Sequence, residues 1–265
     1  MSHQTSSTVS KVVLDTSVIV SASVYGSYVD LGIELHHQFY EKTIPLFDII
    51  KKHIEKRVGI ITLTVENQAI AVIASAVASE LEQKADELDD PQLRADLFES
   101  HAVFFDQCLG HLQDNLSLLQ REPVVLNIKK EQCYVDVTQM YNELQAVANS
   151  FNIEELIRAN VAQRYRQTIR HEIREQYKKR HRQLLKLKSE PVEESDKIIL
   201  CEAITILRIY RKKEPNVQMY LASTDYHFSP SDSGGEIAKQ IRKRFGIICD
   251  WPDKVASYLK SNGLN

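Results

Sequence analysis

Four acidic residues, far apart in the chain, each lie where a predicted strand ends or a predicted helix begins. Asp15 follows the apolar run 11–14, and Asp225 follows a second apolar run. Glu66 and Asp196 each lie at the start of a helical pattern. In a parallel sheet the carboxyl ends of the strands share one edge, and ligands bind there. Carboxylates gathered at that edge repel one another unless a hard divalent cation binds them, so these acids predict a metal site.

Each acid taken singly also has a structural interpretation. Asp15 and Asp196 could cap the helices that follow them. Glu66 could be a first-turn acid stabilised by the helix dipole, and Asp225 could be a turn residue. Hydroxyl residues flank two of the acids and could hold ligand carboxylates or a bound water, or could equally cap helices. These four residues are Thr16, Ser17, Ser223 and Thr224.

The periodicity of the chain predicts strands that alternate with helices at both ends of the sequence. The predicted strands cover residues 11–14, 58–62, 218–223 and 246–249, and the predicted helices cover 31–56, 65–88, 196–211 and 234–245. This alternation predicts an α/β fold with a parallel, doubly wound sheet.

The middle of the chain has almost wholly helical periodicity. Apolar residues recur at helical spacing over 91–121, and Asn152 is expected to cap one long helix that ends near Lys188. The expected organisation is therefore a disordered N-terminus, an α/β domain in two segments and an inserted α-helical region between them. The corresponding ranges are 1–10, then 11–89 with 190–265, and 90–189.

The segments around the four acids resemble the PIN-domain family of metal-dependent ribonucleases. They are Leu14-Asp15-Thr16-Ser17, Thr62-Leu63-Thr64-Val65-Glu66, Asp196-Lys197-Ile198-Ile199-Leu200-Cys201-Glu202-Ala203 and Ser223-Thr224-Asp225. The resemblance covers about 11–85 and 190–255, a little over half of the chain. It implies that Asp15, Glu66, Asp196 and Asp225 are catalytic and bind Mg²⁺ or Mn²⁺. It also implies hydrolysis of RNA phosphodiesters that leaves 5′-phosphate and 3′-hydroxyl ends.

The chain departs from small members of that family in one respect. Here 130 residues separate Glu66 from Asp196, where small members have a few tens. Glu80, further along the same predicted helix, is a rival for the second position, and Asp232 and Glu202 are auxiliary candidates.

A basic segment precedes Asp196. Residues 158–188 carry a net charge of +9, so the rest of the chain carries −12. Eight of its cations are predicted to bind RNA phosphates, although a solvated helix face, or docking to an acidic partner or to the ribosome, is the alternative. A homo-oligomer is a further partner that the sequence leaves open. These cations are Arg164, Arg166, Arg170, Arg174, Lys178, Lys179, Arg180 and Arg182.

Composition narrows the remaining function classes. No run of about 18 apolar residues exists, which predicts no membrane span. The four cysteines are widely spaced, which predicts inert free thiols in a cytoplasmic protein. A haloacid-dehalogenase-like phosphatase would need a second Asp where this chain has Ser17. The main alternative to a metal-dependent endoribonuclease is a non-catalytic RNA-binding or scaffold protein on the same fold.

Overall fold

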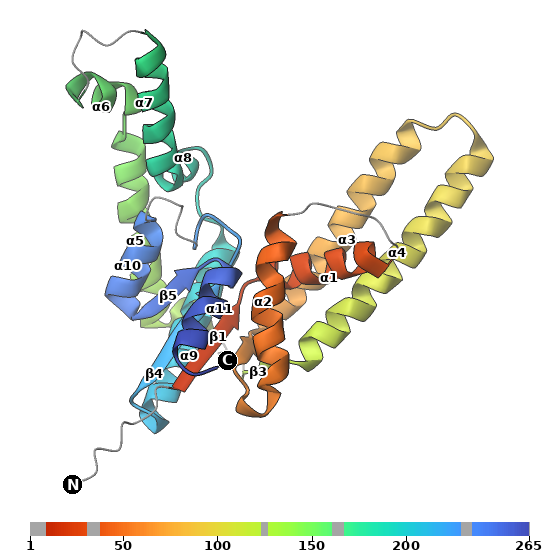
Figure 1. Cartoon of the computed structure of the whole chain (residues 1–265), viewed down its shortest axis with the longest axis horizontal. Helices are drawn as coiled ribbons and strands as arrows, with labels where there is room; N and C mark the ends of the chain where they lie inside the picture. Colours follow the sequence, from red (N-terminus) through yellow and green to blue (C-terminus); the bar gives the residue numbers. More distant parts are fainter. Residues whose placement is uncertain (1–8, 31–37, 123–126, 161–166, 229–234, 265) are drawn as a thin grey trace.

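A five-stranded, all-parallel sheet forms the centre of the molecule (Figure 1). The structure is a computed structural model and describes residues 9–30, 38–122, 127–160, 167–228 and 235–264. The strand order is β3-β2-β1-β4-β5. The strands are β1 (Val9–Leu14), β2 (Gly59–Ile61), β3 (Gln120–Arg121), β4 (Val217–Ala222) and β5 (Ile247–Asp250).

The two longest strands lie next to each other at the centre of the sheet. β1 and β4 pair over six residues, from Val9 beside Val217 to Leu14 beside Ala222. The chain passes outward from β1 to β2 and β3, and then returns to the other side of β1 for β4 and β5. The strand order therefore changes direction between β1 and β4, which is where open α/β sheets bind ligands. The predicted α/β class and parallel sheet are confirmed.

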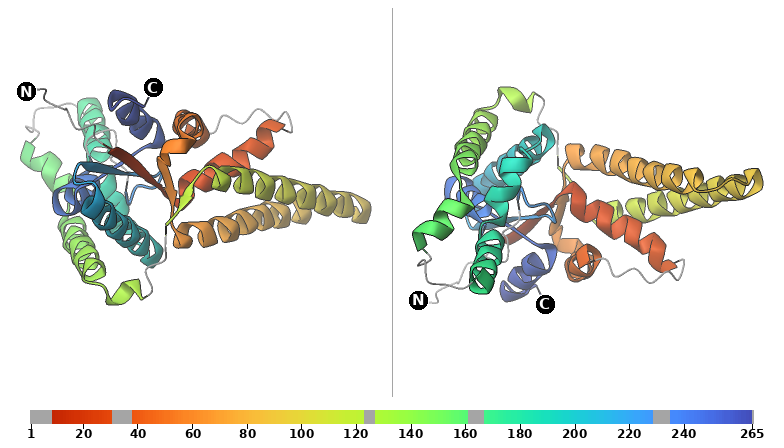
Figure 2. Two further views of the ribbon diagram at one scale, coloured as in Figure 1. Left: turned by 90° about the horizontal axis from the view of Figure 1, so that it is seen from below. Right: turned by 90° about the horizontal axis from the view of Figure 1, so that it is seen from above.

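Helices cover both faces of the sheet. Helices α2 and α11 pack together on one face, and α5 and α9 pack together on the other (Figure 2). The helices are α1 (Thr16–Asp30), α2 (Gln38–Lys52), α3 (Leu63–Asp86), α4 (Pro91–Ser117), α5 (Gln132–Ser150), α6 (Ile153–Asn160), α7 (Gln167–Arg180), α8 (Arg182–Ser189), α9 (Glu194–Lys213), α10 (Glu236–Phe245) and α11 (Pro252–Ser261). None of the described helices combines the length and apolarity needed to cross a membrane.

Helices α3 and α4 form an antiparallel hairpin that projects from the sheet (Figures 1 and 2). Thr62 caps α3 by accepting a hydrogen bond from the backbone N–H of Val65, and Asp90 caps α4 in the same way through the N–H of Gln92. Pro91 occupies the first turn of α4, where its missing N–H costs no hydrogen bond. The hairpin returns the chain to the sheet at β3.

Several predicted boundaries at the start of the chain are wrong. The disordered N-terminus was expected to reach residue 10, but Val9 and Ser10 belong to β1, and residues 1–8 lie outside the described part. The predicted helix over 31–56 corresponds to α2 and the short 3₁₀ turn η1 (Ile54–Lys56), with residues 31–37 not described. Helix α1, directly after Asp15, was not predicted.

The range 90–189 also differs from its prediction. Its almost wholly helical periodicity predicts an α-helical insertion, but β3 lies inside it and extends the sheet beyond β2. β3 has two residues, both polar, and backbone pairing with β2 holds it in the sheet. Its sequence therefore shows no alternation of apolar and polar residues. Helices α5 and α8 of this range supply fully buried side chains to the core, including Val137, Met140 and Leu187.

The single long helix predicted over 152–188 is wrong as well. Asn152 does cap a helix, through the N–H groups of Glu154 and Glu155, but α6 ends at Asn160. Helix α7 contacts α6, and a non-helical residue, His181, separates α7 from α8. The described cations of this segment are therefore distributed over the three helices α6, α7 and α8.

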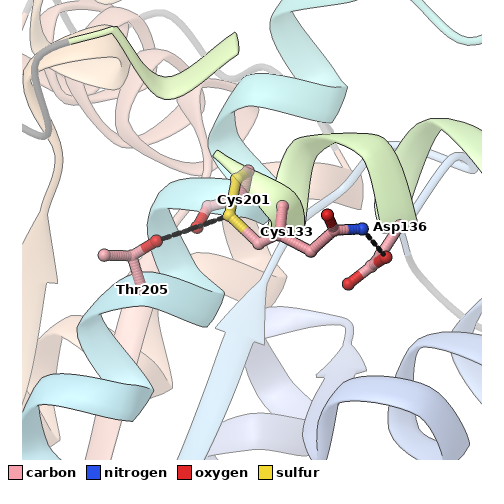
Figure 3. Close-up of a disulfide and its surroundings, with 5 residues drawn as sticks. Cys133, Asp136, Cys201 and Thr205 are labelled. Atoms are coloured by element: carbon pink, nitrogen blue, oxygen red, sulfur yellow. Dashed lines mark hydrogen bonds between the residues drawn. A yellow bond between two sulfur atoms is a disulfide. The ribbon is translucent and has the colours of Figure 1, made fainter. Parts of the chain in front are cut away.

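A disulfide joins two helices on the same face of the sheet (Figure 3). Cys133 at the start of α5 is bonded to Cys201 in the middle of α9, 68 residues away in the sequence. Cys108 and Cys249 are buried and are not part of this disulfide. The prediction of inert free thiols is therefore wrong for Cys133 and Cys201. The bridge connects α9, which begins near Asp196, to α5.

Candidate metal centre

Asp15 lies at the carboxyl end of β1, where the strand order changes direction. Its backbone N–H donates to the carbonyl of Ala222, the last residue of β4, at 3.0 Å. Its side chain is buried, and one carboxylate oxygen, Oδ2, accepts hydrogen bonds from Ser17 Oγ at 2.6 Å and Ser223 Oγ at 2.8 Å. The other oxygen, Oδ1, makes no hydrogen bond with any described residue. One oxygen of this buried carboxylate is thus held in place while the other remains available to a ligand.

The same hydroxyls connect the two strand ends. Ser17 Oγ accepts a hydrogen bond from the backbone N–H of Thr224 at 3.0 Å, and Ser223 Oγ accepts one from the N–H of Asp225 at 2.9 Å. The loop after β4 is therefore fixed against the first turn of α1. The hydroxyl of Thr16 has a different partner, Gln68 Oε1 in α3, at 2.8 Å.

Asp196, Asp225 and His227 form a compact group beside Asp15. One ligand-type atom from each of the three lies within 4.8 Å of the others. His227 Nδ1 is 2.9 Å from Asp196 Oδ2 and 3.3 Å from Asp225 Oδ1, and its Nε2 is 3.4 Å from the carbonyl oxygen of Glu190. Asp196 is mostly buried, with 13% of its side chain exposed, whereas Asp225 is 41% exposed. Solvent therefore reaches the group from the side of Asp225.

The electrostatics confirm that these acids are close to one another. Burial raises the pKa of Asp15 from 3.8 to about 6, against the effect of the hydrogen bonds from Ser17 and Ser223. The negative charges of Asp196 and Asp225 contribute to the same rise. Burial likewise raises the pKa of Asp196, with the charge of Asp225 adding to it. Few cationic side chains lie near these acids among the described residues. A bound cation would therefore stabilise the ionised carboxylates.

His227 provides part of that compensation. Burial alone would lower its pKa, but the hydrogen bond to Asp196 and the charges of Asp225 and Asp196 outweigh burial and raise it above 6.5. The backbone of its loop is also held, because the hydroxyl of Tyr141 in α5 donates to the carbonyl oxygen of His227 at 3.2 Å. His227 was not among the residues singled out from the sequence. Its position two residues after Asp225 was the only available indication.

The structure does not bring Glu66 into this group. Glu66 lies in the first turn of α3 and accepts a hydrogen bond from the guanidinium of Arg121, at the end of β3, at 2.7 Å. Its role as a metal ligand stays a prediction. Its rival Glu80 lies on α3, but its side chain is outside what the structure describes, and Asp232 lies outside the described residues.

Glu202 is buried on the face of α9 that meets α3. Its Oε1 accepts a hydrogen bond from Thr64 Oγ1 at 2.7 Å. Burial raises the pKa of Glu202, and hydrogen bonds from Thr62 and Thr64 oppose that rise. This carboxylate therefore ties α9 to the start of α3.

The predicted RNA-binding cations that the structure describes differ in what they contact. Arg174 pairs with Glu154 of α6, and Lys178 pairs with Glu175. Arg182, at the start of α8, lies over the ring of Tyr226 with its guanidinium carbon 4.3 Å from the ring centroid. Tyr226 is the residue between Asp225 and His227, so Arg182 is the predicted cation that the structure brings next to the acidic group. Arg170, Lys179 and Arg180 lie on α7, and Arg164 and Arg166 lie outside the described residues.

Comparisons of the chain with family models, with curated proteins and with solved structures found no match. The function is therefore argued from the residues of this centre.

Proposed function

We propose that this protein is a Mg²⁺- or Mn²⁺-dependent endoribonuclease that hydrolyses phosphodiester bonds of RNA at the centre formed by Asp15, Asp196 and Asp225. The observation that carries the proposal is the convergence of these three carboxylates where the strand order changes direction. Carboxylate oxygens are the ligands that Mg²⁺ and Mn²⁺ prefer, and both ions also bind phosphate oxygens.

The donor set fits a hard divalent cation. Asp196 and Asp225 each offer an oxygen within 4.8 Å of the other, and Asp15 has an oxygen without a protein partner among the described residues. When bound, such a cation supplies a water of lowered pKa and positive charge opposite the phosphate oxygens. Asp15, Asp196 and Asp225 would hold it, with Glu66 retained as a fourth ligand only if it leaves Arg121.

The remaining side chains of the centre have supporting roles. Ser17 and Ser223 fix one oxygen of Asp15, and His227 fixes one oxygen of Asp196. Partners of this kind orient metal ligands, and their loss typically lowers metal affinity about 10- to 100-fold. Asp225, as the most exposed of the three acids, faces the side from which a phosphate would approach.

RNA would reach this centre along the basic surface of α7 and α8. Arg182 is positioned beside Asp225 by its stacking on Tyr226, and Arg180 lies two residues earlier. Arginines placed in this way neutralise phosphates of the strand on one side of the scissile bond. The ion pairs made by Arg174 and Lys178 reduce what those two residues contribute.

A non-catalytic RNA-binding protein on the same fold is the second candidate. The pairing of Glu66 with Arg121 favours it, because it leaves three carboxylates at the centre instead of four. The two candidates differ in one observable property. A binding module retains RNA without cleaving it, whatever divalent cation is added.

The decisive experiment compares cleavage of structured and unstructured RNAs in Mn²⁺ by the wild type and by Asp15→Asn. Asp250→Asn is the matched control, because Asp250 ends β5 at the same edge but is bonded to Tyr258 and to the N–H of Trp251. We expect cleavage by the wild type and the control and no cleavage by Asp15→Asn or in the presence of EDTA. Cleavage that survives Asp15→Asn, or that is indifferent to EDTA, would refute the metal mechanism.

A further inference from the structure

A pocket of about 400 Å³ lies between α5, α8 and α10, outside the acidic centre. These three helices are adjacent in Figure 1, where α8 contacts both of the others. Its volume is within the range of pockets that take small ligands. No part of the proposed reaction accounts for it.

The pocket is lined partly by cations. Arg180 and Lys239 line it, and neither has an acidic partner among the described residues. Two acids also line it: Glu143 pairs with Arg244, and Glu236 keeps its charge while it accepts a hydrogen bond from the neutral amide of Gln240 at 3.1 Å. The three cations and two acids among the lining residues leave a net charge of +1.

The pocket also has apolar and aromatic lining residues. Leu144, Val147 and Leu184 line it, and Val147 is 51% exposed in spite of its apolar side chain. His181 also lines the pocket, and its ring packs against those of Phe151 and Tyr177. An anionic group and a flat apolar group together would satisfy these two kinds of lining residue, and a nucleotide has both.

The pocket is connected to the acidic centre through one buried side chain. Gln183 lines the pocket and is only 3% exposed. Its Nε2 donates to the carbonyl oxygen of Tyr226 at 3.1 Å, and its Oε1 accepts from the N–H of Ile237 in α10 at 3.2 Å. Since Tyr226 directly follows Asp225, Gln183 links the pocket to the loop that carries this acid.

We propose that this pocket is a subsite for single-stranded RNA and binds one nucleotide of the strand whose scissile phosphate lies at the acidic centre. Arg180 and Lys239 bind the phosphate, and Leu144, Leu184 and His181 contact the base. This inference rests on the proposed function, because the RNA must also reach Asp225. It adds that binding requires an unpaired strand, since a base in a duplex is not available to a pocket.

The test is a double substitution, Arg180→Glu with Lys239→Glu, in the full chain. The control is Lys212→Glu with Lys213→Glu, which makes the same change in charge at exposed residues at the far end of α9. RNA affinity is measured by fluorescence anisotropy with a labelled single-stranded RNA in EDTA, so that cleavage does not interfere. Cleavage is then measured in Mn²⁺ over a range of RNA concentrations, and circular dichroism verifies folding.

We expect RNA affinity of the pocket variant to fall at least about tenfold, with KM raised and kcat retained. The salt dependence of log Kd should become shallower by about 0.7, because one phosphate contact on a single strand is lost. The control should show neither change. A second measurement, photo-crosslinking of the wild type to an RNA that contains 4-thiouridine, should label peptides of α8 or α10.

The outcomes separate this inference from the proposed function. If the wild type cleaves RNA but the pocket variant retains affinity, KM and salt slope, the subsite is refuted and the nuclease stands. Equal losses in the control would also refute it, since they would reflect charge in general. If duplex RNA binds as tightly as the single strand, the requirement for an unpaired base is wrong. A wild type that neither binds nor cleaves RNA overturns both.

Discussion

The carboxyl edge of the sheet contains acids in two different settings. Beside β1 and β4, Asp15, Asp196 and Asp225 lie close together, and the pKa of Asp15 rises to about 6. Beyond β2 and β3, Glu66 lies against Arg121 and is neutralised by it. An acid with a guanidinium partner is already compensated and has no electrostatic need for a metal. The three acids near β1 and β4 have one imidazole, His227, between two of them, and their repulsion favours binding of a divalent cation.

The largest expected effect is the difference in kcat between substitutions in the two settings of the edge. Asp196→Asn should lower kcat at least about a hundredfold, because it removes a ligand from the centre that stabilises charge in the transition state. Glu66→Gln should lower it less than about tenfold, since Gln can still accept a hydrogen bond from Arg121. RNA cleavage in saturating Mn²⁺ measures both. Equal losses would mean that Glu66 leaves Arg121 and joins the metal site in the active enzyme.

His227 should determine Mn²⁺ affinity through Asp196. His227→Phe keeps the ring volume but removes the nitrogen that holds Asp196 Oδ2, so the Kd for Mn²⁺ should rise about 10- to 100-fold. His227→Asn should restore part of the affinity, because its amide can still donate a hydrogen bond. Isothermal titration with Mn²⁺ is the measurement, and His101→Phe is the control, since His101 is buried in the α3–α4 hairpin and its Nδ1 lies 3.0 Å from the carbonyl oxygen of Leu97 in its own helix. Should His227→Phe bind Mn²⁺ as the wild type does, Asp196 is held by something else.

Asp15→Asn should stabilise the metal-free protein. The folded-state pKa of Asp15 is raised to about 6, so the folded protein holds a proton that the unfolded chain has lost, and stability falls as pH rises from 3.8 to about 6. The rise corresponds to a cost of about 1–3 kcal/mol at pH 7 that the neutral amide avoids. Urea unfolding in EDTA at pH 4.5 and pH 7 should show the variant gaining stability mainly at pH 7. An equal or lower stability at pH 7 would mean that Asp15 is a structural acid.

The sequence predicted the central part of this edge well, for an identifiable reason. β1 and β4 each end in a short apolar run, 12–14 and 219–222, that is followed by polar residues, so the positions of Asp15 and Asp225 could be predicted from the strand ends. Asp196 followed from the polar residues that open α9. These three acids lie at the ends of strands or at the start of a helix. Such boundaries can be recognised from the residue types in the local sequence.

What the sequence could not predict depends on contacts between distant segments. His227 has a role only because α9 and the carbonyl of Glu190, 31 and 37 residues away, approach its ring. Arg121 meets Glu66 across 55 residues, by way of a strand too short to show a pattern. The disulfide between Cys133 and Cys201 spans 68 residues. None of these pairings has a local sequence pattern, because the tertiary fold alone brings the partners together.

The smallest expected effect concerns the neutralised side of the edge. Arg121→Ala removes the partner of Glu66, but the side chain of Arg121 is 67% exposed, so the pair is screened by solvent. The free energy of unfolding should therefore fall by less than about 1 kcal/mol. The more informative readout is Mn²⁺ affinity, which should stay unchanged if Glu66 remains apart from the other acids once its partner is gone. A tighter Kd for Mn²⁺ in Arg121→Ala would instead show that Arg121 withholds a fourth ligand from the metal, and the two settings of the edge would then be alternative states of one site.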